Sequence, residues 1–259
     1  MAQSKRVVVV MPAYNASKTL ERTYADIPPG IVDKVILVDD VSRDDTVEIA
    51  QRLGLTVIVH PRNKGYGGNQ KTCYLEALKD GADVVVMLHP DYQYDSRRIP
   101  ELIQPILDDK ADMVFGSRFL GDGPLAGGMP LYKYLSNRFL TITENLAFGL
   151  RLSECHTGFR AYSRKLLQTI PFVLNSDNFV FDTEVIAQAV AFGFRIAEIG
   201  VPTRYFEDAS SVNFGNSIIY GLSTLRVVAR FLLDRGGFRR NPQLRRTLAD
   251  VTADRRALA

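Results

Sequence analysis

The fold of this chain is decided by the stretch Val84-Val85-Val86-Met87-Leu88-His89-Pro90-Asp91-Tyr92-Gln93-Tyr94-Asp95. Its five leading apolar residues are typical of a short strand buried on both faces, and the polar run marks the end of that strand. In an open α/β sheet, ligands bind outside the carboxyl ends of the central strands. His89, Asp91 and Gln93 alternate along this end. We therefore predict a ligand site here, with a polar strand-to-loop junction as the alternative.

The donor atoms of this stretch indicate which ligand to expect. Asp91 offers a carboxylate, Gln93 an amide oxygen and His89 an imidazole nitrogen. Oxygen donors suit Mg²⁺ or Mn²⁺, which commonly keep coordination positions for water and for substrate phosphates. The stretch therefore predicts a divalent cation bound together with a phosphorylated ligand.

Strands and helices alternate on both sides of this stretch. The pattern predicts further strands over residues 6–11, 34–38, 55–59, 112–116, 155–162 and 195–201, the last at a sheet edge. It predicts helices over 17–25, 45–53, 69–79, 97–107, 132–150, 183–192 and 213–233, with glycine-containing loops over 61–68 and 121–128. This alternation is typical of an α/β fold with a mainly parallel central sheet, flanked by helices and wound with right-handed crossovers.

Composition narrows the class of protein. The 259 residues carry a formal net charge of +3, but residues 235–259 hold seven arginines against two aspartates, so the remainder is slightly acidic. A nucleic-acid binder would spread basic charge over its surface, and we expect no nucleic-acid partner. Cys73 and Cys155 lack metal or redox spacing and indicate buried thiols in a reducing compartment. No signal peptide or membrane-spanning run is recognised, so a cytoplasmic location is expected.

Two further segments carry residues suited to a nucleotide. Asp39 and Asp40 follow the second predicted strand, where carboxylates can accept hydrogen bonds from a base or a ribose. The neighbouring Asp44 and Asp45 are explained equally well as caps of the next helix. Gly65-Tyr66-Gly67-Gly68 permits close approach of the backbone to a diphosphate, although a generic turn fits equally. The chain has neither a P-loop nor the dinucleotide glycine pattern, so neither of those folds is supported.

Six short motifs, taken in order, resemble family 2 glycosyltransferases of the GT-A fold, particularly the dolichol- and polyprenyl-phosphate sugar synthases. They are Met11-Pro12-Ala13-Tyr14-Asn15, Val38 to Asp44, Asn63 to Gly67, His89 to Gln93, Gly116-Ser117-Arg118 and Thr157-Gly158-Phe159-Arg160. The resemblance implies a single Rossmann-like GT-A domain over 1–232, with a nucleotide-sugar-binding half (1–116), an acceptor half (117–205) and a C-terminal helix (206–232). A basic tail over 233–259 would follow.

The resemblance also implies roles for individual residues. The residues expected to act in the chemistry are Asp91 and Arg118, with Asp182 or Glu184 as the base for a hydroxyl acceptor, and those expected to bind the metal are His89, Asp91 and Gln93. Nucleotide-sugar binding is implied for Pro12, Ala13, Tyr14, Asn15, Asp39, Asp40, Ser42, Lys64, Gly65, Gly67, Asn69, Pro90 and Arg204, the last closing over the diphosphate. Acceptor binding is implied for Lys133, Ser136 and Arg160.

Three positions depart from the family pattern. Ala16 stands where many relatives have glutamate, and Val41 stands where glycine is usual. His89 replaces the first aspartate of the usual Asp-x-Asp. Losing that negative charge should weaken Mg²⁺ binding and favour a metal that tolerates imidazole, such as Mn²⁺.

The function implied is inverting, metal-dependent transfer of a hexose from a UDP- or GDP-sugar to a polyprenyl phosphate. A lipid phosphate is already ionised and needs positioning by cations, whereas a hydroxyl acceptor needs a base, for which Asp182 or Glu184 is the candidate. The alternatives are transfer to a soluble or glycan hydroxyl, and a non-catalytic nucleotide-sugar binder.

A lipid acceptor requires access to the membrane. Residues 218–233 are apolar apart from Arg226, Arg230 and neighbouring polar positions, which suits an interfacial helix near anionic lipid on the inner face of the membrane. The alternatives are a helix packed on the domain with a disordered basic tail, or an oligomer contact.

Overall fold

A seven-stranded sheet forms the centre of the protein, in a computed structural model that describes residues 5–120, 123–125, 128–202 and 214–257. The strand order is β3-β2-β1-β4-β6-β5-β7. β6 runs antiparallel to its neighbours β4 and β5, and the other pairs are parallel. The strands are β1 (Val7–Ala13), β2 (Lys34–Asp39), β3 (Thr56–Val59), β4 (Val84–Met87), β5 (Met113–Ser117), β6 (Arg160–Ser163) and β7 (Ile196–Gly200). The predicted fold class is confirmed, and β7 lies at the predicted edge.

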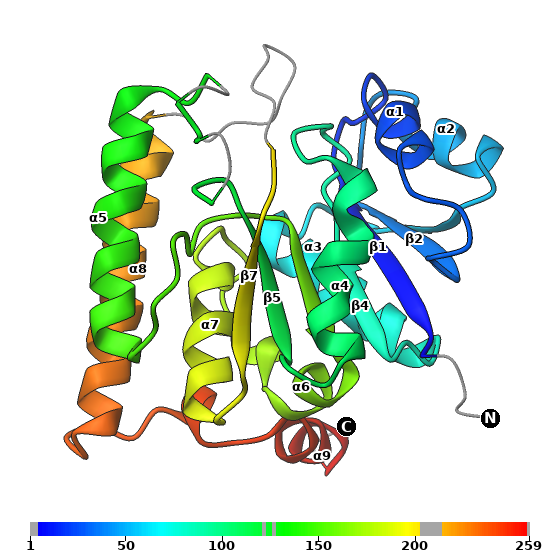
Figure 1. Cartoon of the computed structure of the whole chain (residues 1–259). Helices are drawn as coiled ribbons and strands as arrows, with labels where there is room; N and C mark the ends of the chain where they lie inside the picture. Colours follow the sequence, from blue (N-terminus) through cyan, green and yellow to red (C-terminus); the bar gives the residue numbers. More distant parts are fainter. Residues whose placement is uncertain (1–4, 121–122, 126–127, 203–213, 258–259) are drawn as a thin grey trace.

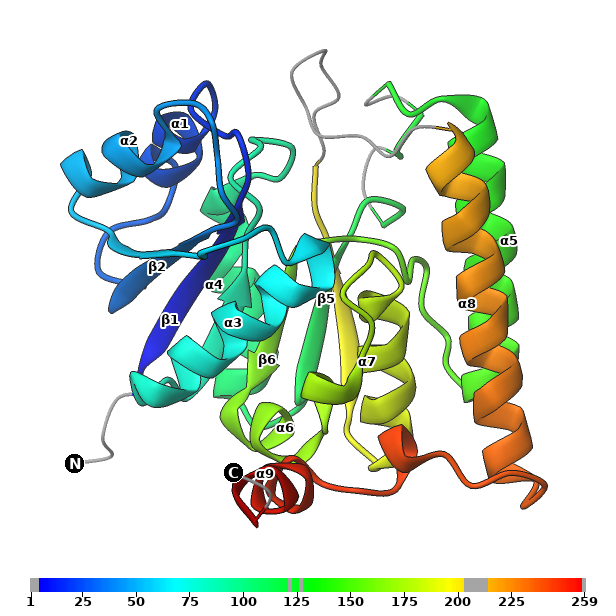
Figure 2. The same cartoon turned by 180° about the vertical axis from the view of Figure 1, so that it is seen from behind.

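Helices cover both faces of the sheet because successive strand side chains point to opposite sides. Val8 and Val10 of β1 belong to one apolar cluster, whereas Val7 and Val9 belong to the other. The first cluster is covered by α3 (Gly65–Lys79), α6 (Arg164–Thr169) and α7 (Phe181–Ala191). The second is covered by α1 (Leu20–Ala25), α2 (Thr46–Arg52) and α4 (Ile99–Leu107) (Figures 1 and 2). The fully buried valines of β4 therefore lie between two helical layers.

Helix α4 shows how sequence periodicity becomes packing. Ile99, Leu102, Ile103 and Ile106 recur at helical spacing and are each at most 4% exposed. Burying each side chain contributes about 1.5–3 kcal/mol. The helix follows a single 3₁₀ turn, η1 (Ser96–Arg98), whose first amides are capped by Asp95 accepting from the Arg97 N–H. This cap fixes where the chain leaves the loop after β4.

Two long helices stand beside the sheet. In both views α5 (Leu131–Phe148) and α8 (Phe214–Arg235) lie side by side at one end of the molecule, and α8 also contacts α7 (Figures 1 and 2). The predicted loop before α5 falls partly outside the described residues. Within the described parts of the chain, no helix has both the length and the apolarity needed to cross a bilayer.

Several element boundaries differ from the sequence prediction. β1 continues through Pro12 to Ala13, beyond the predicted end at residue 11. Proline is tolerated there because the pairing of β1 with β4 already ends at Val10, so the missing N–H of Pro12 interrupts no hydrogen bond on that side. α1 begins at Leu20, since the Ser17 amide donates to Asp44 instead of opening the helix. The predicted strand over 155–162 begins only at Arg160. Both cysteines are buried and unpaired, as expected.

The segment expected to be a basic tail is largely folded onto the domain. It contains η3 (Pro242–Leu244) and α9 (Leu248–Ala257), and α9 contacts α6. Leu244, Leu248 and Val251 are at most 8% exposed. The Arg245 guanidinium pairs with Asp234 at 2.8 Å. The burial of these apolar side chains, rather than the charge of the arginines, holds this segment on the domain.

Candidate active site

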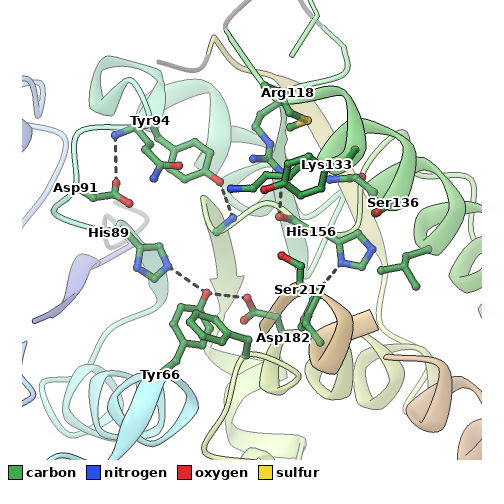
Figure 3. Close-up of a pocket in the computed structure, with 18 residues that line it drawn as sticks. Tyr66, His89, Asp91, Tyr94, Arg118, Lys133, Ser136, His156, Asp182 and Ser217 are labelled. Atoms are coloured by element: carbon green, nitrogen blue, oxygen red, sulfur yellow. Dashed lines mark hydrogen bonds between the residues drawn. The ribbon is translucent and has the colours of Figure 1, made fainter. Parts of the chain in front are cut away.

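A cavity of about 250 Å³ opens at the carboxyl ends of β4 and β5 (Figure 3). His89, Asp91 and Gln93 line it after β4, and Arg118 lines it after β5. α5 contributes a second wall, and residues of α3, α7, α8 and the segment before β6 complete it. The lining residues from these elements include Tyr66, Lys133, Ser136, His156, Asp182, Ser217 and Tyr220. Asp91 belongs to the expected nucleotide-sugar-binding half and Lys133 to the expected acceptor half, and both residues line this cavity.

The turn after β4 directs Asp91 and Gln93 into the cavity. Tyr92 has a positive φ of 59°, which reverses the chain between them. The Asp91 carboxylate accepts a hydrogen bond from the backbone N–H of Gln93 at 3.1 Å. The Thr19 hydroxyl donates to the Pro90 carbonyl at 2.6 Å and anchors the turn on the first helix. Pro90 therefore holds the loop in place through its backbone.

His89 is held between a tyrosine and a glycine. Its ring stacks on Tyr66 with centroids 5.5 Å apart, and the Tyr66 hydroxyl lies 3.4 Å from Nε2. A Cβ at Gly158 would lie 2.8 Å from the imidazole, so only glycine fits there without displacing the ring. Burial lowers the pKa of His89 against the opposing effect of Asp91 and Asp182. The imidazole is therefore neutral near pH 7, the form that can ligate a metal.

These residues fit a cation that arrives with a phosphorylated substrate. Among the described residues, no group of three or more His, Cys, Asp or Glu side chains is placed to enclose a metal. One carboxylate, one amide and one imidazole on a single cavity wall leave several coordination positions for other ligands. Mg²⁺ in particular is commonly held by one or two carboxylates and by substrate phosphates. The expected Asp91, Gln93 and His89 set suits this arrangement.

Arg118 reaches the cavity already paired. Its guanidinium and backbone amide both bind Glu154, with Nε 2.8 Å from Oε1, and Nη2 donates to the His156 carbonyl at 3.1 Å. Burial by itself would raise the pKa of Glu154, but the charge and hydrogen bonds of Arg118 and the Asn137 amide hold it below its usual value. Glu154, which the sequence prediction missed, therefore fixes the direction of Arg118 and neutralises it.

Lys133 gives the α5 wall its positive charge. Within the described chain, no carboxylate forms an ion pair with its ammonium group. Arg118 and Lys133 line the same cavity, and burial followed by the charge of Arg118 lowers the pKa of Lys133. Ser136 follows one turn later and lines the same cavity. Because Glu154 already neutralises Arg118, Lys133 is the charge on this wall that favours an anionic ligand.

The two carboxylates of α7 have different surroundings. Asp182 lines the cavity, where it accepts from the Tyr66 hydroxyl at 2.8 Å and from Gln70 at 3.2 Å and pairs with Arg160 at 3.2 Å. Two hydrogen-bond donors and one buried cation therefore already occupy this carboxylate. Glu184 lies at a separate small cavity, where it accepts from the Ser176 amide at 2.6 Å. The structure therefore does not bring Glu184 to the predicted site.

Arg160 also differs from its predicted acceptor-binding role. It is 1% exposed, its guanidinium lies 4.9 Å from the Phe115 ring centroid, and it donates to the Thr157 and Cys155 carbonyls. It does not line the cavity. Its charge acts on the site through Asp182.

The ends of β1 and β2 form the predicted nucleotide edge. Ala13 pairs in register with Asp39, which brings Pro12, Tyr14 and Asn15 beside that carboxylate. Asp39 Oδ2 accepts from the Ser42 amide at 2.9 Å, whereas the buried Oδ1 has no hydrogen-bond partner among the described residues. A buried acceptor of this kind suits a ligand N–H or O–H donor. The nucleotide roles of this edge remain predictions.

Several residues of the predicted nucleotide set also make contacts that support the fold. Asp40 accepts from the Lys64 and Gly65 amides at 2.8 and 3.0 Å and so anchors the start of α3. A Cβ at Gly67 would lie 2.3 Å from the Ser176 carbonyl oxygen. The buried Asn69 amide donates to the Val38 carbonyl at 3.0 Å.

The predicted loop over 61–68 is wrong in its last four residues, because α3 begins at Gly65. Gly65 and Gly67 lie close to the backbone carbonyls of Asp177 and Ser176, and their role at a diphosphate stays a prediction. Lys64 is exposed at this edge, and Arg204 lies outside the described residues.

This fold and site define a GT-A-type transferase. The profile described as glycosyl transferase family 2 matches residues 8–170. The chain therefore belongs to this family, which confirms the predicted resemblance and the predicted enzyme class, a hexosyltransferase.

Three relatives match between 76% and 86% of the chain. An uncharacterised protein of Methanocaldococcus jannaschii is 30% identical over 219 residues, which are 85% of this chain and 89% of that protein. A UDP-N-acetylglucosamine–dolichyl-phosphate N-acetylglucosaminyltransferase of Methanococcus voltae is 28% identical, covering 86% and 97%. An undecaprenyl-phosphate mannosyltransferase of Micrococcus luteus is 25% identical, covering 76% and 82%. Glucosyl-3-phosphoglycerate synthase from Mycobacterium tuberculosis shares the fold, with a TM-score of 0.68 at 22% identity over 91% and 81% of the two chains.

Proposed function

We propose that the protein transfers a hexose from a UDP- or GDP-sugar to a polyprenyl phosphate, with inversion and with a divalent cation. The observation that carries this proposal is Lys133, a cavity lysine without a carboxylate partner among the described residues, on a helix whose exposed face is apolar. The names of the Methanococcus voltae and Micrococcus luteus relatives give dolichyl phosphate and undecaprenyl phosphate as their acceptors.

The outer surface of α5 and α8 suits a lipid acceptor. On α5 the exposed large hydrophobic side chains are between 41% and 81% exposed, and none of the exposed α5 positions is charged. We call those that are more than half exposed, with their neighbours on α8, the α5–α8 apolar face: Leu131, Leu135, Phe139, Ile142, Leu146, Ile218, Ile219 and Leu222. Large exposed apolar side chains gathered on two neighbouring helices indicate a membrane or protein contact. It begins beside Ser136 and Ser217 at the cavity, so a prenyl chain can leave the cavity along it.

One wall of the cavity would bind the donor diphosphate with its cation, and the opposite wall would bind the acceptor. Asp91, Gln93 and His89 would hold the divalent cation, which when bound neutralises charge on the leaving diphosphate. Across the cavity, Lys133 and Ser136 hold the acceptor phosphate so that its oxygen attacks the anomeric carbon from the face opposite the diphosphate, which inverts that carbon. The acceptor is already ionised and needs no base. This agrees with an Asp182 carboxylate that is occupied by two hydrogen-bond donors and paired with Arg160.

Transfer assays with matched acceptors test the proposal. Nucleotide sugars labelled in the hexose are offered with a short-chain polyprenyl phosphate or with the corresponding free alcohol. We expect product only from the phosphate. Because a hydrogen bond to a charged group is worth about 1.5–3 kcal/mol, Lys133→Ala should raise the acceptor KM by about tenfold or more. Lys165→Ala, at an exposed position of α6, is the control. Equal transfer to the free alcohol would overturn the phosphate acceptor.

We also propose peripheral contact with the membrane through the α5–α8 apolar face. Phe139→Glu places a charge at a position that is 59% exposed and should reduce sedimentation with anionic liposomes. Val59→Glu, on the edge strand β3 and 53% exposed, is the matched control. Truncation at Arg235 is a poorer test because it would remove the buried Leu244 and Leu248. Unchanged liposome binding by the α5 variant would exclude this face.

A further inference from the structure

The segment 175–180, between η2 (Phe172–Leu174) and α7, forms part of the cavity wall next to His89. Phe179 of this segment lines the cavity, and its ring centroid lies 4.6 Å from that of Tyr66. Tyr66 in turn stacks on His89. Figure 3 shows Tyr66 and His89 on the opposite side of the cavity from the labelled α5 residues. The position of this segment therefore bears on the wall that would bind the cation and the donor.

The segment meets the start of α3 backbone to backbone. The Gly67 N–H donates to the Asp177 carbonyl at 2.7 Å, and a Cβ at Gly67 would lie 2.3 Å from the Ser176 carbonyl oxygen. The Lys71 ammonium group pairs with Asp177 at 2.7 Å. Because the contacts at Gly67 join backbone to backbone, a shift of the segment is transmitted to the first turn of α3, which carries Tyr66.

Gln243 of η3 holds the segment from the other side. Its side-chain nitrogen lies 3.1 Å from the Leu174 carbonyl oxygen and 3.2 Å from Asn175 Oδ1. The same nitrogen lies 3.2 Å from Glu184 Oε1, while Glu184 Oε2 accepts from the Ser176 N–H at 2.6 Å. Because acceptor oxygens surround it, the nitrogen and not the oxygen of the Gln243 amide faces them.

The acceptors that Gln243 reaches are buried. Asn175 is 5% exposed and Glu184 is 7% exposed, and the amide groups of Asn175 and Gln188 donate to one another at 3.0 and 2.7 Å. Leu244, the residue after Gln243, is itself packed in the core. Removing the Gln243 donor would leave buried acceptors short of a partner, which favours a displaced segment.

We propose that Gln243 is a positioning residue for the cation-binding wall. It holds the segment 175–180 in place, and through Phe179 and the start of α3 it keeps Tyr66 against His89. The inference rests on the proposed function, because that function assigns His89 to the cation. Gln243 belongs to no motif recognised in the sequence, and it lies in the stretch expected to be a basic tail.

Hydrogen exchange in the metal-free protein tests the structural part of this inference. Gln243→Met keeps the length of the side chain and removes its N–H donors. We expect the amide protons of Ser176 and Gly67 to exchange about threefold to tenfold faster relative to those of β4. Ile106→Val, on α4 at the other face of the sheet, is the control for a general loss of stability and should leave this ratio unchanged.

A cation titration of hexose transfer tests the functional part. In Gln243→Met the donor KM and the Mn²⁺ concentration for half-maximal rate should rise about threefold to tenfold, with the acceptor KM within about twofold of wild type. Phe179→Leu should have the same effect on the Mn²⁺ requirement. The double variant should add little, because both residues act through the contact with Tyr66.

The outcomes separate this inference from the function on which it rests. If transfer by wild type needs no divalent cation, the proposed cation and the role of Gln243 are both overturned. If wild type needs the cation and Gln243→Met equals it in exchange and in Mn²⁺ requirement, only the role of Gln243 is overturned. Should Gln243→Met not fold, a wild-type Mn²⁺ requirement in Phe179→Leu would overturn the link through this segment.

Discussion

The turn at Val41 offers a quantitative test of backbone strain at the predicted nucleotide edge. Val41 has a φ of +68°, in the left-handed region that β-branched residues rarely adopt. It is 38% exposed, so little packing is lost when the side chain is removed. Replacing Val41 by glycine removes about 1–2 kcal/mol of backbone strain from the folded state. The greater conformational freedom of glycine in the unfolded chain lowers stability by about 0.5–1 kcal/mol. Val41→Gly should therefore stabilise the protein by about 1 kcal/mol.

Thermal and urea unfolding measure this difference. For a chain of this size, about 1 kcal/mol corresponds to a rise in Tm of about 2 °C. The matched control is Val59→Gly, because Val59 is similarly exposed but lies in the extended strand β3, where glycine weakens the strand. We expect a lower Tm for the control. If both variants lost stability, the conformation at Val41 would not be strained and the reasoning would fail.

Three further predictions concern the site and its support. His89→Asp should shift the metal preference of transfer from Mn²⁺ towards Mg²⁺, and an unchanged metal profile would show that His89 only packs on Tyr66. Gly67→Ala should cost about 1–3 kcal/mol in urea unfolding because its Cβ meets a backbone carbonyl at 2.3 Å. Gly221→Ala, with its nearest contact at 3.9 Å inside α8, should instead be neutral or stabilising, and equal losses would exclude the clash. Burial raises the pKa of Glu184 above its ordinary 4.5, so the folded state binds this proton more tightly than the unfolded state. The stability of wild type relative to Glu184→Gln should therefore fall as pH rises from 4.5 to 7, while turnover is retained; loss of turnover would restore Glu184 as a candidate base.

Local sequence patterns were sufficient for the framework of the protein. The valine runs at Val7–Val10 and Val84–Val86 predict strands buried on both faces, and the structure places both between helical layers. Polar residues that follow a strand directly, such as Asp91 and Arg118, also reach the cavity. These inferences succeed because hydrophobic periodicity and strand ends are properties of short segments.

Tertiary packing decided which polar residues belong to the site. Asp182 and Glu184 are two positions apart in the sequence, yet the helix turns them to different cavities. Gly67 is glycine because of a carbonyl more than a hundred residues away, at Ser176, which no local pattern reveals. The antiparallel insertion of β6 between β4 and β5 was likewise not evident from the strand pattern.

The sequence by itself determined the order of strands and helices and the strand end at His89 to Asp95, where Asp91 faces the cavity. Only the tertiary structure decided that Arg118 is neutralised by Glu154 and that Gln243 donates to Glu184. The physical reason is the range of the interactions. Strand formation follows from neighbours along the chain, whereas the charge of a buried side chain depends on whatever packing brings within hydrogen-bond distance.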